Sequence, residues 1–128
     1  MAAHQPSGWH TVTPRIVTSE VAALVAFLRH TFGGRGEVEE GRPSEVAIGD
    51  SIVMVSSLGE REAFPAFLYV YVDDVDATFA RAIAAGATAL EAPQDTSYGD
   101  YRAMLRDSWG NLWQIASRSA GVFRPQSA

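Results

Sequence analysis

The order of the elements that the chain predicts is repeated, and this repeat constrains the fold more than any other feature. Residues 11–19 read as a strand, and residues 19–34 carry apolar side chains at helical spacing before two glycines. Three short strands are predicted next, at 36–41, 44–50 and 51–57. The same order returns in the second half at 66–74, 74–87, 88–93, 101–107 and 111–117. The sequence therefore predicts two βαβββ modules.

An alignment of the two halves gives the positions that correspond in this repeat. With Thr13 placed on Phe67, the first strands and helices of the halves align without gaps. With Gly49 placed on Gly110, the last strands align and Val53 falls on Gln114. Identity between the halves is low, so the shared order of elements is the stronger observation.

Two paired modules can bury the sheet face that a single small module would leave exposed. We therefore predict an α+β fold in which two paired βαβββ modules form a curved mixed sheet with a central cup and the helices outside. Ser19 and Asp74 are the expected N-caps of the two helices. Alternation along the strands predicts these residues in the cup: Thr13, Arg15, Val17, Ser51, Val53, Val55, Phe67, Tyr69, Tyr71, Leu112, Gln114 and Ala116.

The predicted boundaries describe one domain with two halves. They are a flexible N-terminus at 1–10, a first module at 11–57, a linker at 58–65, a second module at 66–118 and a flexible C-terminus at 119–128. Pairing of the modules within one chain and exchange between chains are both compatible with this pattern.

Composition excludes several classes of function. There is no cysteine, which excludes disulfides and thiolate chemistry, and all ten basic residues are arginine, which excludes a lysine Schiff base. The net charge of -5 and the lack of a basic run make nucleic acid an unsuitable partner. No apolar run reaches the roughly 20 residues of a membrane span, and the start is not a signal peptide, so we expect a cytoplasmic protein.

Three segments resemble the vicinal oxygen chelate superfamily, which groups glyoxalases, bleomycin-resistance proteins and extradiol dioxygenases, and in particular its small PhnB-like branch. They are VTPRIVTSEVAALVAFLRHTFGG, YVYVDDVDATFARAIAAGATAL and YGDYRAMLRDSWGNLWQIA. The motif RDSWGNLWQIA is similar to the family's Asp-Pro-x-Gly-Asn turn, with Ser108 in place of proline. The resemblance implies a homodimer and, in the enzymes, one divalent metal in the cup.

The metal positions that the resemblance implies carry unsuitable side chains here. They correspond to Thr13, Val53, Phe67 and Gln114, of which only Gln114 is a reasonable ligand. A divalent metal needs three or more oxygen or nitrogen donors. We therefore expect no cofactor, with a divalent metal as the less favoured alternative.

The side chains around the predicted cup indicate its ligand. An inward Arg15 favours an anionic or carbonyl-bearing ligand, or a partner such as Glu45; a solvated position or a dimer contact would explain it equally well. Aromatic walls favour stacking on a flat compound, although the same rings could fill the core. The predicted ligand-binding residues are Arg15, Phe67, Tyr69, Tyr71, Tyr101, Trp109 and Gln114, and no catalytic residue is predicted.

Three functions remain open at this point. The first is a metal-free protein that sequesters a small apolar or aromatic compound, such as an antibiotic, in a dimer cleft. The second is a lyase, isomerase or dioxygenase of the same superfamily that acts on a small carbonyl or aromatic substrate. The third is a scaffold that uses the fold only to dimerise.

Overall fold

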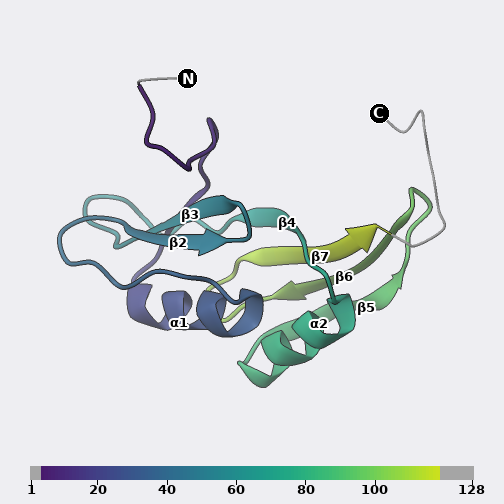
Figure 1. Cartoon of the computed structure of the whole chain (residues 1–128). Coiled ribbons are helices and arrows are strands. Elements are labelled where there is room, and N and C mark those ends of the chain that lie inside the picture. The colour runs from purple at the N-terminus through teal and green to yellow at the C-terminus, as the bar shows by residue number, and fades with distance from the viewer. Residues whose placement is uncertain (1–3, 119–128) are drawn as a thin grey trace. The chain divides into compact units, whose positions relative to one another are not determined.

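The computed structural model describes residues 4–118, so the predicted flexible end at 119–128 and the first three residues lie outside the described part. The fold is α+β, as the sequence predicts, with two mixed sheets of three and four strands and one helix for each sheet (Figure 1). The chain divides between Pro65 and Ala66 into two compact units. Within residues 4–118, neither helix has the length and apolar character needed to cross a membrane.

The first unit has a three-stranded sheet beneath one helix. Its elements are β1 (Arg15–Val17), α1 (Val21–Phe32), β2 (Ser44–Ile48) and β3 (Ser51–Ser56). The central strand β3 pairs parallel to β1 and antiparallel to β2. A turn at Gly49-Asp50 joins β2 to β3, with Gly49 at a φ of 57°. A two-residue hairpin of this kind favours glycine because an L side chain is strained at positive φ.

Two predictions for the first unit are wrong. The strand predicted at 36–41 is absent, because after one bridge between Arg35 and Ala47 the backbone takes positive φ values of 143° at Gly36 and 73° at Gly41, where the chain bends. These values lie outside the β region, and Gly36 passes so close to the Glu45 carbonyl that no side chain would fit. Ser19 is not the N-cap of α1 either. Glu20 occupies that position and its side chain makes no capping hydrogen bond.

The second unit has all the predicted elements. They are β4 (Phe67–Tyr71), α2 (Val75–Ala84), β5 (Thr88–Asp95), β6 (Asp100–Arg106) and β7 (Leu112–Arg118), in the sheet order β4-β7-β6-β5. β4 pairs parallel to β7, and the other pairs are antiparallel. Asp74 caps α2 as predicted, because its carboxylate accepts a hydrogen bond of 3.0 Å from the backbone N–H of Ala77.

The strand registers correct the alignment of the two halves by one residue. Arg15 pairs with Met54 in the first unit, and Tyr69 pairs with Gln114 in the second. Because Arg15 corresponds to Tyr69, the counterpart of Gln114 is Met54 and not Val53. Val53 is buried directly opposite Val46, on the sheet face that carries Ile16 and faces α1. Val53 and Val55 therefore belong to the core of the first unit, and their predicted position in a cup is wrong.

Each unit has its own apolar core between the helix and one face of the sheet. In the first unit the core residues are Ile16, Leu24, Val25, Phe27, Leu28, Val46, Val53 and Val55. In the second they are Val75, Ala82, Ala103, Leu105, Trp113 and Ile115. Trp113 is fully buried on the helix side of its sheet, opposite in phase to Gln114. Burial of side chains of this size is the main term that stabilises each unit.

The carboxylate of Asp107 joins the turn before β7 to two strands. Its Oδ1 accepts from the backbone N–H groups of Trp109 and Asn111, and its Oδ2 accepts from Asn111 Nδ2 and Trp113 Nε1, all at 2.9 Å. Asn111 Oδ1 in turn accepts from the Ala66 N–H at 2.8 Å, at the entry to β4. Asp107 and Asn111 are therefore residues that hold the geometry of this turn.

Replacement of Asp107 by alanine should destabilise the protein by about 3 kcal/mol, because buried donors lose their acceptor. Chemical denaturation monitored by circular dichroism measures the change. Asp50→Ala is the matched control, since Asp50 is an exposed turn residue whose side chain, within the described part of the chain, accepts only from the Ser51 hydroxyl. Its effect should stay within about 0.5 kcal/mol. Equal losses in the two variants would contradict the structural role of Asp107.

Candidate functional site

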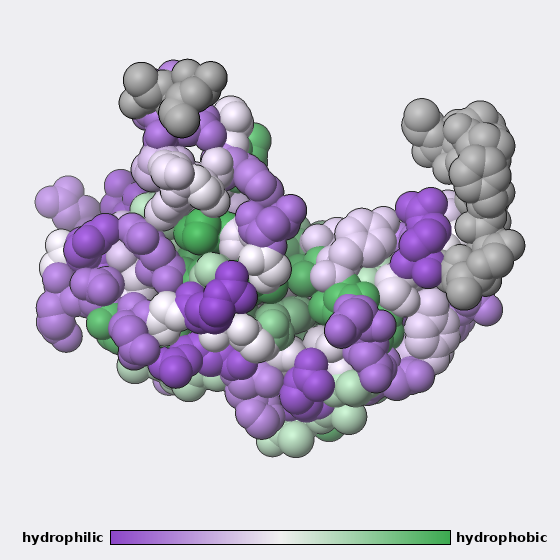
Figure 2. Space-filling view, viewed as in Figure 1, coloured by the Kyte–Doolittle hydropathy of each residue, from purple (hydrophilic) through white to green (hydrophobic). Residues whose placement is uncertain are grey.

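The strand β4 presents a row of aromatic side chains on the face of its sheet opposite α2. Phe67, Tyr69 and Tyr71 alternate with Leu68 and Val70 and are 60%, 38% and 59% exposed. Tyr98, which is also exposed, lies beside Tyr69, and hydrophilic residues predominate on the surface in view in Figure 2. Three such residues on one five-residue strand therefore mark this face as a candidate ligand surface.

We call this surface the aromatic face and define it by strand alternation and register. Gln114 of β7 pairs with Tyr69 of β4 and with Met104 of β6. Tyr71 pairs with Ala116, which pairs with Arg102. The residues of the aromatic face are therefore Phe67, Tyr69, Tyr71, Asp100, Arg102, Met104, Arg106, Leu112, Gln114, Ala116 and Arg118.

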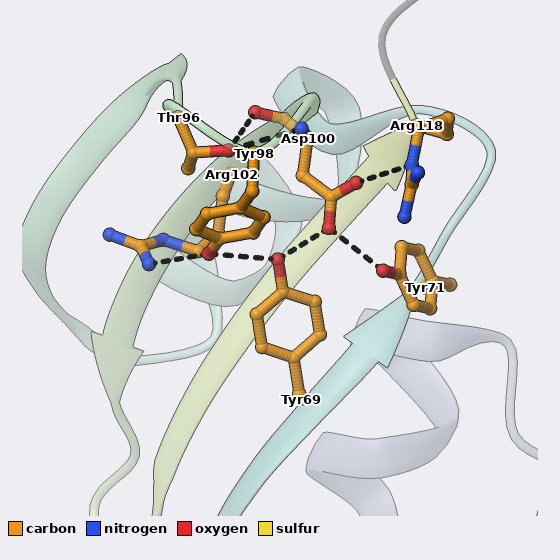
Figure 3. Close-up of polar contacts among 7 residues, drawn as sticks. All are labelled: Tyr69, Tyr71, Thr96, Tyr98, Asp100, Arg102 and Arg118. Atoms are coloured by element: carbon orange, nitrogen blue, oxygen red, sulfur yellow. Dashed lines mark hydrogen bonds and ion pairs between the residues drawn. The ribbon is translucent and has the colours of Figure 1, made fainter. Parts of the chain in front are cut away.

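The polar centre of the aromatic face is the carboxylate of Asp100, which is only 1% exposed (Figure 3). Its Oδ2 accepts hydrogen bonds from the hydroxyls of Tyr69 at 2.7 Å and Tyr71 at 2.8 Å. Its Oδ1 accepts from Arg118 Nε at 2.8 Å, across the β6–β7 pair. Both oxygens are thus satisfied, and the two rings are held 5.4 Å apart at an interplanar angle of 59°.

A second layer of contacts fixes this centre. The Tyr98 hydroxyl lies 3.3 Å from that of Tyr69 and accepts from Arg102 Nη1 at 2.9 Å. Arg102 Nη2 also pairs with Glu91 at 2.7 Å. Thr96 closes the turn before β6, because its hydroxyl accepts from the Asp100 N–H and donates to the Asp100 carbonyl. The network leaves the tyrosines little rotational freedom.

The network also shifts the pKa values of its members. Burial raises the pKa of Asp100, but the hydrogen bonds from Tyr69 and Tyr71 and the charge of Arg118 outweigh it, and the net pKa lies below the ordinary 3.8. Burial, together with hydrogen bonds to Tyr98 and Asp100, raises the pKa of Tyr69 far above 10.0. Asp100 is therefore ionised and Tyr69 protonated at neutral pH. The pair is a fixed acceptor and donor, and neither group has the near-neutral pKa that suits a general acid or base.

The structure brings four of the predicted ligand-binding residues together and places three elsewhere. Phe67, Tyr69, Tyr71 and Gln114 share the aromatic face. Tyr101 lies on the helix face of the same sheet and donates to Asp76 of α2 at 2.8 Å. Trp109 lies in the turn before β7, and Arg15 belongs to the first unit. Arg15 contacts Ser56, while the partner suggested for it, Glu45, pairs with Arg42.

Sequence analysis missed Asp100, Arg102 and Arg118. The predicted strands at 101–107 and 111–117 stop one residue short of Asp100 and of Arg118. A signal was nevertheless present, because extension of the hairpin by one pair on each strand puts Asp100 opposite Arg118. Opposite charges across a strand pair are favourable.

The donors needed for a divalent metal are poorly represented at the positions that the resemblance implies. Thr13, Val53 and Phe67 offer at most one hydroxyl, and the corrected register replaces Val53 by the Met54 thioether. Gln114 adds one amide oxygen. Among residues 4–118 there is no cluster of three His, Cys, Asp or Glu side chains that could hold a metal ion. The side chains at these positions therefore do not fit a hard divalent ion.

The match to a known family agrees with this architecture. Residues 9–115 match the family described as Glyoxalase/Bleomycin resistance protein/Dioxygenase superfamily, and the chain belongs to it. A 51-residue segment is 39% identical to uncharacterized proteins of Mycobacterium bovis and Mycobacterium tuberculosis. This segment covers 40% of the chain but only 34% and 30% of those proteins, respectively.

Solved structures of the same fold cover most of the chain. TioX from Micromonospora sp. ML1 is 26% identical with a TM-score of 0.74, over 85% of this chain and 98% of that one. A glyoxalase/bleomycin resistance protein/dioxygenase family enzyme from Burkholderia phytofirmans PsJN is 25% identical with a TM-score of 0.73, over 83% and 96%. Lactoylglutathione lyase from Agrobacterium tumefaciens is 19% identical with a TM-score of 0.68, over 92% and 98%, and so shares the fold.

Replacement of Asp100 by asparagine should destabilise the protein by roughly 2 kcal/mol at pH 7, because charge-assisted hydrogen bonds are lost. The pKa of Asp100 is lower in the folded than in the unfolded state, so its contribution is complete above the unfolded value and disappears as the pH falls through the folded value. The difference in the free energy of unfolding between wild type and variant should therefore become smaller below about pH 4. Denaturation curves at several pH values measure it, with Asp50→Asn as control. A gap independent of pH would contradict an ionised Asp100.

Proposed function

We propose that this protein binds and sequesters a small, largely apolar or aromatic compound, such as an antibiotic, without using a metal. The observation that carries the proposal is the exposed row of Phe67, Tyr69 and Tyr71, held in place by the buried Asp100 carboxylate. Exposure of aromatic rings to water is unfavourable, and stacking on a flat ligand removes part of that cost. In the proposed complex a second copy of the chain completes the cleft.

The rigidity of the aromatic face favours binding. Tyr69 and Tyr71 each donate to Asp100, so their side chains are ordered before a ligand arrives. A ligand that stacks on ordered rings avoids the cost of about 0.5–1.5 kcal/mol for each side chain that binding would otherwise immobilise. The tyrosine hydroxyls are already engaged, so the rings offer mainly their apolar faces and little further polar recognition.

Two observations support the metal-free part of the proposal. The implied ligand positions carry Thr13, Met54 or Val53, Phe67 and Gln114, which do not supply three hard donors. Phe67 is also the first member of the aromatic row, so its ring, which has no donor atom, occupies a position where a metal ligand would be needed. The family description includes bleomycin resistance proteins, whose name associates this superfamily with tolerance of an antibiotic.

The second candidate is an enzyme of the same superfamily, a lyase, isomerase or dioxygenase acting on a small carbonyl or aromatic substrate. Its support is the similarity to the Burkholderia phytofirmans family enzyme. The pKa shifts weigh against acid–base catalysis at the aromatic face, because Asp100 is a weakened base and Tyr69 a weakened acid. Binding is therefore the better supported of the two.

Phe67→Ala and Tyr71→Ala should each weaken the binding of flat aromatic compounds about tenfold, since loss of one stacking ring costs about 1.4 kcal/mol. A thermal-shift screen of such compounds first identifies a ligand, and titration calorimetry then measures its affinity. Ile83→Ala is the matched control, because Ile83 is an exposed apolar residue of α2, which covers the opposite face of the same sheet. Unchanged affinity in both β4 variants would exclude the aromatic face as the binding surface.

Metal content distinguishes the two candidate functions. Elemental analysis after purification without chelators, repeated after exposure to Zn²⁺, Mn²⁺, Ni²⁺ or Fe²⁺, should give far less than one metal per chain. Gln114→Ala should change ligand affinity modestly, whereas in a metal enzyme it would remove metal and activity together. If the wild-type protein binds about one metal per chain and Gln114→Ala abolishes this binding, the result would favour the enzyme. Sedimentation equilibrium tests whether the chain is a dimer.

A further inference from the structure

The first unit contains a cavity of about 440 Å³ that the aromatic face does not use. It lies where the start of α1 meets the ends of β1 and β3 and the segment before β2. Its volume is within the range of small-molecule sites, roughly 300–1,000 Å³. The lining residues that bear charge are Arg15, Arg42, Arg61, Glu39 and Glu40.

Two of the three arginines have guanidinium groups without an acidic partner among residues 4–118. Arg15 donates from Nε to the Ser56 hydroxyl at 2.7 Å, and Ser56 also lines the cavity. The Arg61 side chain makes no hydrogen bond or ion pair with other residues of the described segment 4–118. Arg42 differs, because it is paired with Glu45 at 2.7 Å. Arg15 and Arg61 therefore keep most of their N–H donors for a ligand.

The N-terminus of α1 borders the same cavity. Val21 and Ala22, its first two residues, line the space, and the N-cap residue Glu20 makes no side-chain capping bond. The first N–H groups of a helix have no partner inside the helix and carry the positive end of its dipole. The guanidinium groups of Arg15 and Arg61 favour an anion in this cavity, and the positive end of the α1 dipole adds to that preference.

The glutamates limit the kind of anion that the cavity can accept. Glu39 and Glu40 are exposed side chains on the segment before β2, and they oppose the arginines. A strongly charged polyanion would meet repulsion from both carboxylates. A single compact oxyanion group can contact Arg15 and Arg61 directly while the glutamates remain in solvent.

We infer that this cavity binds the oxyanion group, carboxylate or phosphate, of a small molecule. Arg15 and Arg61 supply bidentate hydrogen bonds to the anion, and the first N–H groups of α1 and the Ser56 hydroxyl border it. The inference concerns the first unit alone and does not depend on the function proposed for the aromatic face.

The test is a titration of the full-length, ¹⁵N-labelled protein with inorganic phosphate or acetate at constant ionic strength. The backbone signals of Val21 and Ala22 and the Nε–H signals of Arg15 and Arg61 should shift saturably, while sodium chloride should cause no such change. Arg61→Gln should weaken binding about tenfold or more. Glu40→Gln should strengthen it by removing a repulsive charge.

Arg29→Gln is the matched control, because it removes the same charge from an arginine of the same unit that does not line the cavity and pairs with Glu37. It should leave phosphate and acetate binding unchanged. Arg61 lies in a loop, so its variant should fold, and a thermal denaturation curve checks this. Equal affinities in Arg61→Gln and Arg29→Gln, or shifts that chloride reproduces, would overturn the inference.

Discussion

The second unit depends on the four hydrogen bonds that the buried carboxylate of Asp107 accepts. One side chain fixes the turn before β7, orients the core indole of Trp113 and, through Asn111, secures the entry to β4. β4 and β7 are parallel neighbours, so no hairpin sets their register. The Asp107–Asn111 pair provides part of that constraint, and the aromatic row on β4 is positioned as a result.

A second buried aspartate uses the same chemistry for a different purpose. Asp107 accepts from backbone, amide and indole N–H groups, whereas Asp100 accepts from two tyrosine hydroxyls and one arginine. Burial of a carboxylate is costly unless its oxygens are hydrogen-bonded, and both residues meet this condition. At Asp100 two of the three donors are hydroxyl groups of Tyr69 and Tyr71, whose rings belong to the candidate site. The polar network thus holds an apolar surface in a fixed arrangement exposed to ligands.

The local patterns predicted the elements of the second unit more closely than those of the first. The strands and helix after Pro65 all formed, because alternation, the Asp74 cap and the Gly110 turn agree with one another. The segment 36–41 failed because strand composition does not reveal that Gly36 must pass against the Glu45 carbonyl. The prediction that Val53 faces the cup is wrong because the alignment of Gly49 with Gly110 is shifted by one residue from the strand registers. A shift of one residue moves a strand side chain to the opposite face of its sheet.

The sequence by itself determined the α+β class, the repeated order of elements and the aromatic alternation of β4, because helix and strand periods and turn residues are local properties. It also determined that hard metal ligands are scarce at the positions that the resemblance implies. Only the tertiary structure decided that Asp100 lies beneath Tyr69 and Tyr71, that Tyr101 faces α2, and that Arg15 and Arg61 line one cavity. These arrangements bring together residues about 25 to 46 positions apart. Their geometry depends on strand register and on the path of the loops, which no local pattern in a single sequence encodes.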